Sequence, residues 1–175
     1  MKPTLIWHHL PQFAEGYLAA LPYQSVYARC LSAVHVRIRH LNLPGIDTAG
    51  IVVRKLPWAR EFTQGTLPLP GIVITPEGQE SAPAGHGTNL RDDIGYPVLV
   101  TLLAADNEQI AGAMELPLLW REQIARAFRQ QRLLTVDEVI GCTVEPQTVI
   151  ATEAYQRGVL QSAVLLRFIS RERRK

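Results

Sequence analysis

The sequence predicts an α/β (α+β) fold, in which two main helices pack on a mostly antiparallel β-sheet of about four to six strands. Three observations indicate it. Apolar residues make up 47% of the 175-residue chain and charged residues 19%, which is ordinary for one packed domain. Two segments repeat apolar residues at helical spacing. Several shorter apolar runs are bounded by turn-forming residues, which is typical of strands.

Residues 1–23 predict an irregular N-terminal arm, because three prolines interrupt the segment. Its aromatic side chains are expected to anchor the arm on another surface. These anchors are Trp7, Phe13 and Tyr17. Residues 24–171 then form a single α/β domain, and residues 172–175 form a basic C-terminal tail.

The first helix is expected from about Gln24 or Ser25 to about Leu41. Ser25 is a suitable N-cap, and Pro44-Gly45 stops the helix. The apolar residues near one face are Val26, Cys30, Ala33, Val34 and Leu41. We interpret both cysteines, Cys30 and Cys142, as small core residues that stay reduced.

Two short strands follow, over Gly50 to Val53 and Gly71 to Thr75, with a long connection that contains several prolines. The second strand leads into a turn at Pro76-Glu77-Gly78. A connection as long as the one between these two strands is usually functional or lies at an interface.

A charged loop, Gly87 to Gly95, is the most distinctive feature of the sequence, and it leads into an apolar strand over Pro97 to Ala105. It belongs to the segment Gly85 to Gly95, which also contains His86. Paired carboxylates beside a histidine suit a divalent cation. Adjacent residues on an extended chain point to opposite sides, however, so only one of Asp92 and Asp93 can face a common site. The alternative is a structural loop in which an Asp accepts backbone N–H bonds or pairs with an Arg.

The second helix is expected to begin near Pro117, because the fixed φ of proline suits the first turn. Its core-facing residues repeat at helical spacing, and they are Trp120, Ile124, Ala127 and Phe128. Two strands complete the domain, over Val139 to Val144 and Val159 to Ser170.

The charges are segregated along the chain, although the net charge is only +2. From Glu77 to Glu153 twelve acidic residues oppose five Arg, and the remainder carries thirteen Lys or Arg against four acids. Complementary faces of this kind suit head-to-tail packing. The basic C-terminal run is also open to interpretation as a nucleic-acid contact.

Several function classes find no support in the sequence. The longest apolar stretches are shorter than the roughly 20 residues that cross a bilayer, so we expect no membrane partner. The start lacks a signal-peptide pattern, which predicts cytosolic synthesis. No phosphate-binding Gly-rich turn precedes a helix, and neither a Gly-x-Ser-x-Gly nor a zinc pattern occurs. We therefore expect no catalytic residues, no cofactor and no metal.

The order of the elements resembles that of the tail terminator and tail-completion (neck) proteins of tailed bacteriophages. The resemblance spans roughly Gln24 to Arg171 and lies in the layout more than in a signature. The segments that carry it are Pro70 to Pro76, Tyr96 to Thr101, the helix around Leu118 to Phe128, Cys142 to Pro146, and Ser162 to Phe168.

The resemblance implies a structural virion protein that acts through protein surfaces. In that family the subunits form a hexameric ring that caps the tail tube and joins it to the neck. It implies assembly in the host cytoplasm, with itself, the tail tube protein and neck or connector proteins as partners. The acidic stretch would then line a lumen through which DNA passes.

The charged loop is accordingly expected to be an assembly element, in which Asp92 or Asp93 meets an Arg across a subunit boundary. The residues expected at a subunit or partner interface are Arg91, Asp92, Asp93, Arg167 and Arg171. The arm and the segment Asp47 to Pro70 are larger than a minimal family member needs, which leaves open a head-completion or adaptor protein. A metal-dependent, nuclease-like enzyme that uses Asp92, Asp93, Glu77 or Glu80 is the alternative from another class.

Overall fold

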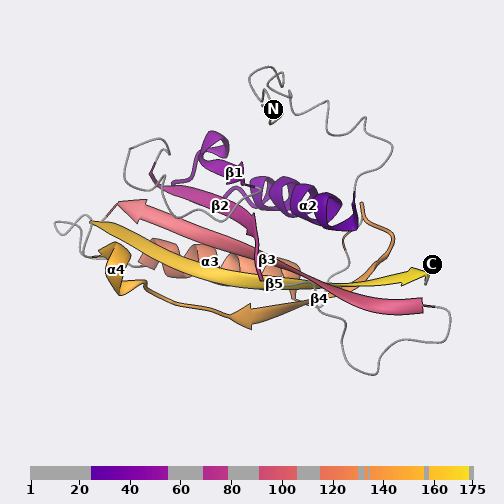
Figure 1. Ribbon diagram of the computed structural model, residues 1–175. Helices are drawn as coiled ribbons and strands as arrows, with labels where there is room; N and C mark the ends of the chain where they lie inside the picture. The colour runs from indigo at the N-terminus through magenta and orange to yellow at the C-terminus, as the bar shows by residue number, and fades with distance from the viewer. Residues whose placement is uncertain are drawn as a thin grey trace, which may run out of the picture.

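The computed structural model describes residues 25–54, 69–78, 91–105, 115–129, 133, 135–155 and 158–173. The predicted arm and its anchors Trp7, Phe13 and Tyr17 lie outside the described residues, as do Glu80 and His86. The described elements form one five-stranded sheet with two main helices, α2 and α3, which confirms the predicted fold class (Figure 1).

Helix α2 (Val26–His40) begins where the sequence predicts it to begin. The side chain of Ser25 accepts a hydrogen bond from the backbone N–H of Ala28, at 3.2 Å, which satisfies one of the donors that a helix start leaves open. The buried face of the helix carries Cys30, Leu31, Val34 and Ile38. A 3-10 turn, η1 (Thr48–Gly50), then leads directly into the sheet.

The strands are β1 (Ile51–Val53), β2 (Gly71–Pro76), β3 (Arg91–Ala105), β4 (Val139–Pro146) and β5 (Val159–Arg173). Their order in the sheet is β1-β2-β3-β5-β4. Strands β1 and β2 are parallel, and every other neighbouring pair is antiparallel. The long strands β3 and β5 therefore form the centre of the sheet.

Strand β3 begins six residues before Pro97, so the prediction that Arg91 to Gly95 belong to a loop was wrong. Each of these residues pairs with β5, from Arg91 opposite Arg173 to Gly95 opposite Ile169. Strand β2 pairs with β3 only as far back as Val98, and β4 pairs with β5 only as far as Ser170. The ends of the two central strands, 91–93 and 171–173, therefore project as a two-stranded ribbon (Figure 1). Strand β5 also takes in the first two residues of the segment predicted as a basic tail.

Pro97 fits inside the long strand because its backbone nitrogen and oxygen point toward β2 rather than β5. Its carbonyl oxygen accepts a hydrogen bond from the backbone N–H of Glu77, at 3.1 Å, and another from the hydroxyl of Tyr27. The N and O of one strand residue point to the same side, so the nitrogen of Pro97 also faces away from β5. The missing N–H therefore costs the central ladder nothing.

Strand β4 is an edge strand of the described sheet, since it pairs with β5 alone. A register irregularity lies between Val139 and Gly141, and the strand ends at Pro146. The short helix α4 (Thr152–Tyr155) follows and contacts β5.

Helix α3 (Glu115–Phe128) and helix α2 pack on the same face of the sheet, because their buried side chains belong to one core cluster with the strands. Helix α2 contacts β1 to β3, and α3 contacts β3, β4 and β5. As predicted, Trp120, Ile124 and Phe128 are buried. Phe128 meets Phe168 edge to face, with ring centroids 6.1 Å apart.

Both cysteines are buried and free, as the sequence predicts. Burial raises the pKa of the Cys30 thiol to about 12, and it raises the pKa of the Cys142 thiol to about 12 as well. Each thiol therefore stays protonated and packs as a small apolar group.

Candidate assembly surfaces

Asp93 pairs with Arg171 of the same chain. The guanidinium donates from Nε to Oδ1 at 2.7 Å and from a terminal nitrogen to Oδ2 at 2.9 Å. The two residues lie directly opposite each other on β3 and β5. The Asp93 side chain is only 5% exposed, whereas that of Arg171 is 41% exposed, and the hydrogen bond to Asp93 raises the pKa of Arg171. The pair joins two strands within one subunit, whereas the prediction was of an Asp–Arg pair across a subunit boundary.

Asp92 and Asp93 lie on opposite faces of the sheet, as expected for adjacent residues of a strand. In the register Asp92 lies opposite Glu172, on the face that carries the helices. Among the described residues, no three His, Cys, Asp or Glu side chains are grouped so that they could hold a metal ion. The geometry therefore divides the Asp pair between two environments.

Addition of Mg²⁺ or Mn²⁺ is expected to shift the thermal unfolding midpoint by no more than about 1 °C, because both oxygens of Asp93 accept from Arg171. Differential scanning fluorimetry of EDTA-treated protein, with and without the metal, measures this. A site filled at a hundred times its Kd would stabilise the fold by about 2.7 kcal/mol. That would raise the midpoint by roughly 5–10 °C and contradict the expectation.

Arg167 pairs with Glu145 of β4, with Nε to Oε1 at 2.6 Å and a second contact to Oε2 at 3.3 Å. The hydrogen bond to Glu145 raises the pKa of Arg167. Arg167 and Arg171 are four residues apart on the same face of β5, so one arginine ties β5 to β4 and the other ties it to β3. Arg91 is exposed at the start of the ribbon.

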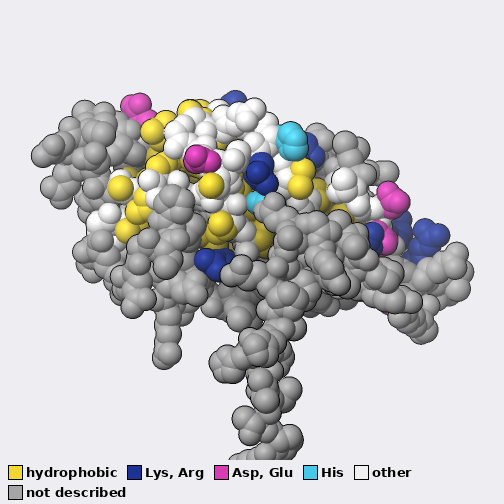
Figure 2. Space-filling view, turned by 90° about the horizontal axis from the view of Figure 1, so that it is seen from above, with side chains coloured by type: hydrophobic (Ala, Val, Ile, Leu, Met, Phe, Trp, Pro, Cys, Tyr) yellow, Lys and Arg dark blue, Asp and Glu magenta, His cyan; other side chains and the backbone are white. Residues whose placement is uncertain are grey.

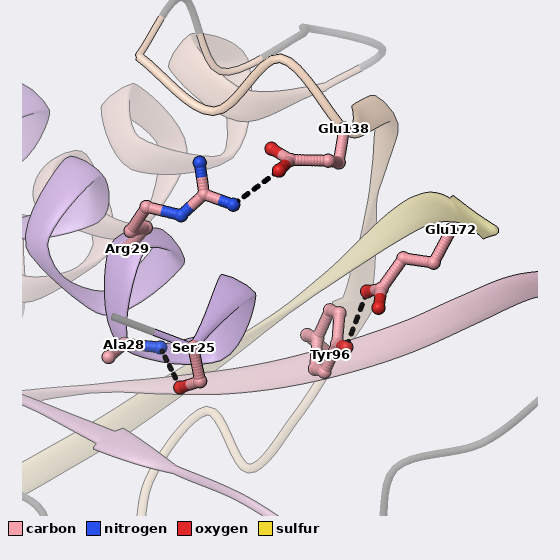
Figure 3. A network of polar contacts seen from close by, with 6 residues as sticks. All are labelled: Ser25, Ala28, Arg29, Tyr96, Glu138 and Glu172. Carbon is pink, nitrogen blue, oxygen red and sulfur yellow. Dashed lines mark hydrogen bonds and ion pairs between the residues drawn. The ribbon is translucent and has the colours of Figure 1, made fainter. Parts of the chain in front are cut away.

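A second polar network joins the start of α2 to the ends of the strands (Figure 3). Arg29 donates to Glu138 Oε1 at 2.5 Å, and the hydroxyl of Tyr96 donates to Glu172 Oε1 at 2.6 Å. The backbone carbonyl of Glu138 also accepts from the N–H of Arg171, at 2.9 Å. These contacts fasten the first turns of α2 and the segment before β4 to the C-terminal end of β5.

Folding stability is expected to decrease as the pH is lowered into the acidic range, in part because of Glu138. Its hydrogen bond with Arg29 holds the pKa of the Glu138 carboxyl below its ordinary value. A lowered folded-state pKa stabilises the protein above the unfolded pKa, and that stabilisation is lost as pH falls through the folded pKa. Glu138→Gln should therefore cost stability at neutral pH, and the difference from wild type should shrink between about pH 5 and pH 3.

Urea unfolding at several pH values measures this difference. Glu122→Gln is the matched control, since Glu122 and Arg126 form an exposed i,i+4 pair that contributes little. If the difference in unfolding free energy between wild type and Glu138→Gln stays the same at all pH values, the carboxylate charge is not the cause of the pH dependence.

An exposed apolar surface lies around the first turns of α3. We define the α3 surface as Leu116, Leu118, Leu119, Val149 and Ile150, whose residue exposures lie between 38% and 48%. Only two other large hydrophobic residues in the described part of the chain are similarly exposed, Val36 and Leu69. Large apolar side chains exposed on two joined segments suit contact with another protein.

Arg121 holds the two parts of this surface together. From α3 it donates to the carbonyl of Gln147 at 2.9 Å, to the carbonyl of Thr148 at 3.3 Å and to the hydroxyl of Ser162 at 3.2 Å. It also donates to the carbonyl of Ala163. Val149 and Ile150 follow these carbonyls directly, and Leu118 lies one helical turn before Arg121. The surface is therefore fixed to β5 rather than carried by a free loop.

This surface is absent from the predictions made from the sequence, although the sequence contains a signal for it. Leu118 and Leu119 lie off the buried stripe of Trp120, Ile124 and Phe128, so a strict helical reading leaves them facing solvent. The partners Glu138 and Glu145 were also missed, because they are distant in sequence from the arginines they bind.

No protein-family model matches the chain, and no curated protein matches it. Several solved structures do contain similar chains. One is a chain of "Virion of native gene transfer agent (GTA) particle", with 13% identity and a TM-score of 0.41, over 82% of this chain and 94% of that one. None of the described helices is long and apolar enough to cross a membrane.

Proposed function

We propose that the protein is a structural subunit of a phage-like virion, acting as a tail terminator or tail-completion protein. In this proposal its copies form a ring, of six subunits by the family resemblance, that caps the tail tube and joins it to the neck. The observation that carries the proposal is the exposed α3 surface on a rigid two-layer fold. Such a surface is suited to permanent contact with other protein chains.

Three of the charged residues that the sequence pointed to support a structural role. Asp93 pairs with Arg171, and Arg167 pairs with Glu145, in each case across neighbouring strands. One pair joins the central strands β3 and β5, and the other joins β5 to the edge strand β4. Asp93, which the enzymatic alternative would need for chemistry, is thus engaged in holding the sheet together. A rigid subunit with an apolar contact surface is what a closed ring requires.

The partners that follow are further copies of the chain, the tail tube protein and the neck or connector proteins. The acidic stretch from Glu77 to Glu153 would face DNA in the lumen, where like charge prevents adhesion. The protein would be assembled in the host cytoplasm and remain in the virion.

Light scattering after size exclusion, together with negative-stain microscopy, tests the proposal. The expected result is a ring, formed alone or upon addition of tail tube protein. A persistent monomer under both conditions would overturn it. Binding to the connector but not to the tube end would assign the protein to head completion or to an adaptor role instead.

A further inference from the structure

The α3 surface is bordered by acidic side chains. Glu115 and Glu122 are exposed on α3, each one helical turn from both Leu118 and Leu119. Glu122 is engaged with Arg126 at 2.5 Å, and both partners remain more than half exposed. The two central leucines thus lie between carboxylates, and a matching partner needs an apolar contact between basic groups.

Helix α2 presents such a contact on its solvent side. Val36 is 51% exposed, which makes it the most exposed large hydrophobic residue in the described part of the chain. His40 follows one turn later and bonds the Val36 carbonyl oxygen through Nδ1, at 2.7 Å. Arg39 comes three residues after Val36 and Ser32 comes four residues before Val36, so each lies about one helical turn from it. We call Ser32, Val36, Arg39 and His40 the α2 stripe.

Figure 2 looks down on the side of the molecule that carries α2. Hydrophobic side chains lie at this surface beside Lys or Arg and His side chains. Of the two exposed large hydrophobics outside the α3 surface, Val36 is the one that stands on a helix among basic groups. Charge and apolar character therefore match between the two helices.

We propose that the α3 surface of one copy docks on the α2 stripe of a second copy. Leu118 and Leu119 would pack on Val36, while Glu115 and Glu122 would face Arg39 and His40. The contact joins two different surfaces, so each subunit carries one of each. The inference rests on the proposed function for the expectation that copies meet, and it adds where they meet.

The test begins with two substitutions that place a charge in the apolar contact, Leu119→Asp and Val36→Asp. Each is expected to weaken self-association about tenfold or more, measured by sedimentation velocity over a concentration series. Leu69→Asp is the matched control, because Leu69 is 41% exposed and lies outside both surfaces. Circular dichroism and thermal unfolding confirm that every variant is folded.

Charge exchange separates docking from unspecific damage. Glu115→Arg and Arg39→Glu should each weaken association, and the two changes combined in one chain should restore it, because the attraction is then reversed rather than lost. Failure of the double variant to regain association would overturn the proposed pairing.

The outcomes also separate this inference from the proposed function. If the wild-type protein forms rings and the variants do so equally well, the contact proposed here is wrong while the ring stands. If the wild-type protein remains a monomer, with and without tube protein, both are wrong.

Discussion

Replacing Trp120 with alanine is expected to destabilise the fold by about 3–5 kcal/mol. The side chain is 1% exposed and lies in the core cluster between both helices and the sheet. Its indole N–H also donates to the carbonyl oxygen of Pro44, at 2.8 Å, which ties α3 to the segment after α2. Truncation would leave a cavity and remove this bond together.

Equilibrium unfolding in urea measures the loss. Trp120→Phe keeps most of the volume but not the donor, so it should cost less than the alanine variant. Leu119→Ala, one residue away and exposed, should change stability by only about 0.5 kcal/mol. Equal losses for Trp120→Ala and Leu119→Ala would mean that α3 does not pack as described.

Reversing the charge of Asp93 to lysine is expected to lower the unfolding midpoint by about 5 °C or more. The substitution places a cation, nearly buried, against Arg171 on the neighbouring strand. Breaking one partner of a buried pair costs more than the pair itself contributes, because the remaining charge loses its counter-ion. Asp93→Lys is therefore expected to destabilise the fold itself, in addition to any effect on assembly.

Thermal unfolding monitored by circular dichroism measures the effect, and Arg91→Glu is the control. That substitution also reverses a charge on the ribbon, but at an exposed position, so a small change is expected. Combining Asp93→Lys with Arg171→Glu should recover part of the loss. An Asp93→Lys protein that unfolds like wild type but no longer assembles would show that Asp93 acts between subunits.

The elements of the fold were predictable where local patterns are strong. Ser25 caps α2 and the stripe of Trp120, Ile124 and Phe128 marks α3, since both signals operate within one or two helical turns. The core face of β5 was also readable from alternation, through Leu160, Val164, Leu166 and Phe168.

The start of β3 was not predictable, because its glycine and charged residues are atypical of a strand. Pairing with β5 overrides that preference, and the partner lies some eighty positions along the chain. Because Arg171 is so distant in the sequence, an arginine partner could be predicted for Asp93, but not which arginine it would be. The helical pattern places Leu118 and Leu119 off the buried stripe, but that Val149 and Ile150 are exposed as well depends on long-range packing.

The irregular register of β4 and its terminal proline affect how copies of the protein can meet. A regular, unpaired strand edge invites other chains to extend the sheet without limit, which leads to aggregates. A bulge bends that edge, and Pro146 has no N–H to offer. Chains crowded together during particle construction are thereby discouraged from uncontrolled strand addition, which favours association through side-chain surfaces that saturate once they are filled.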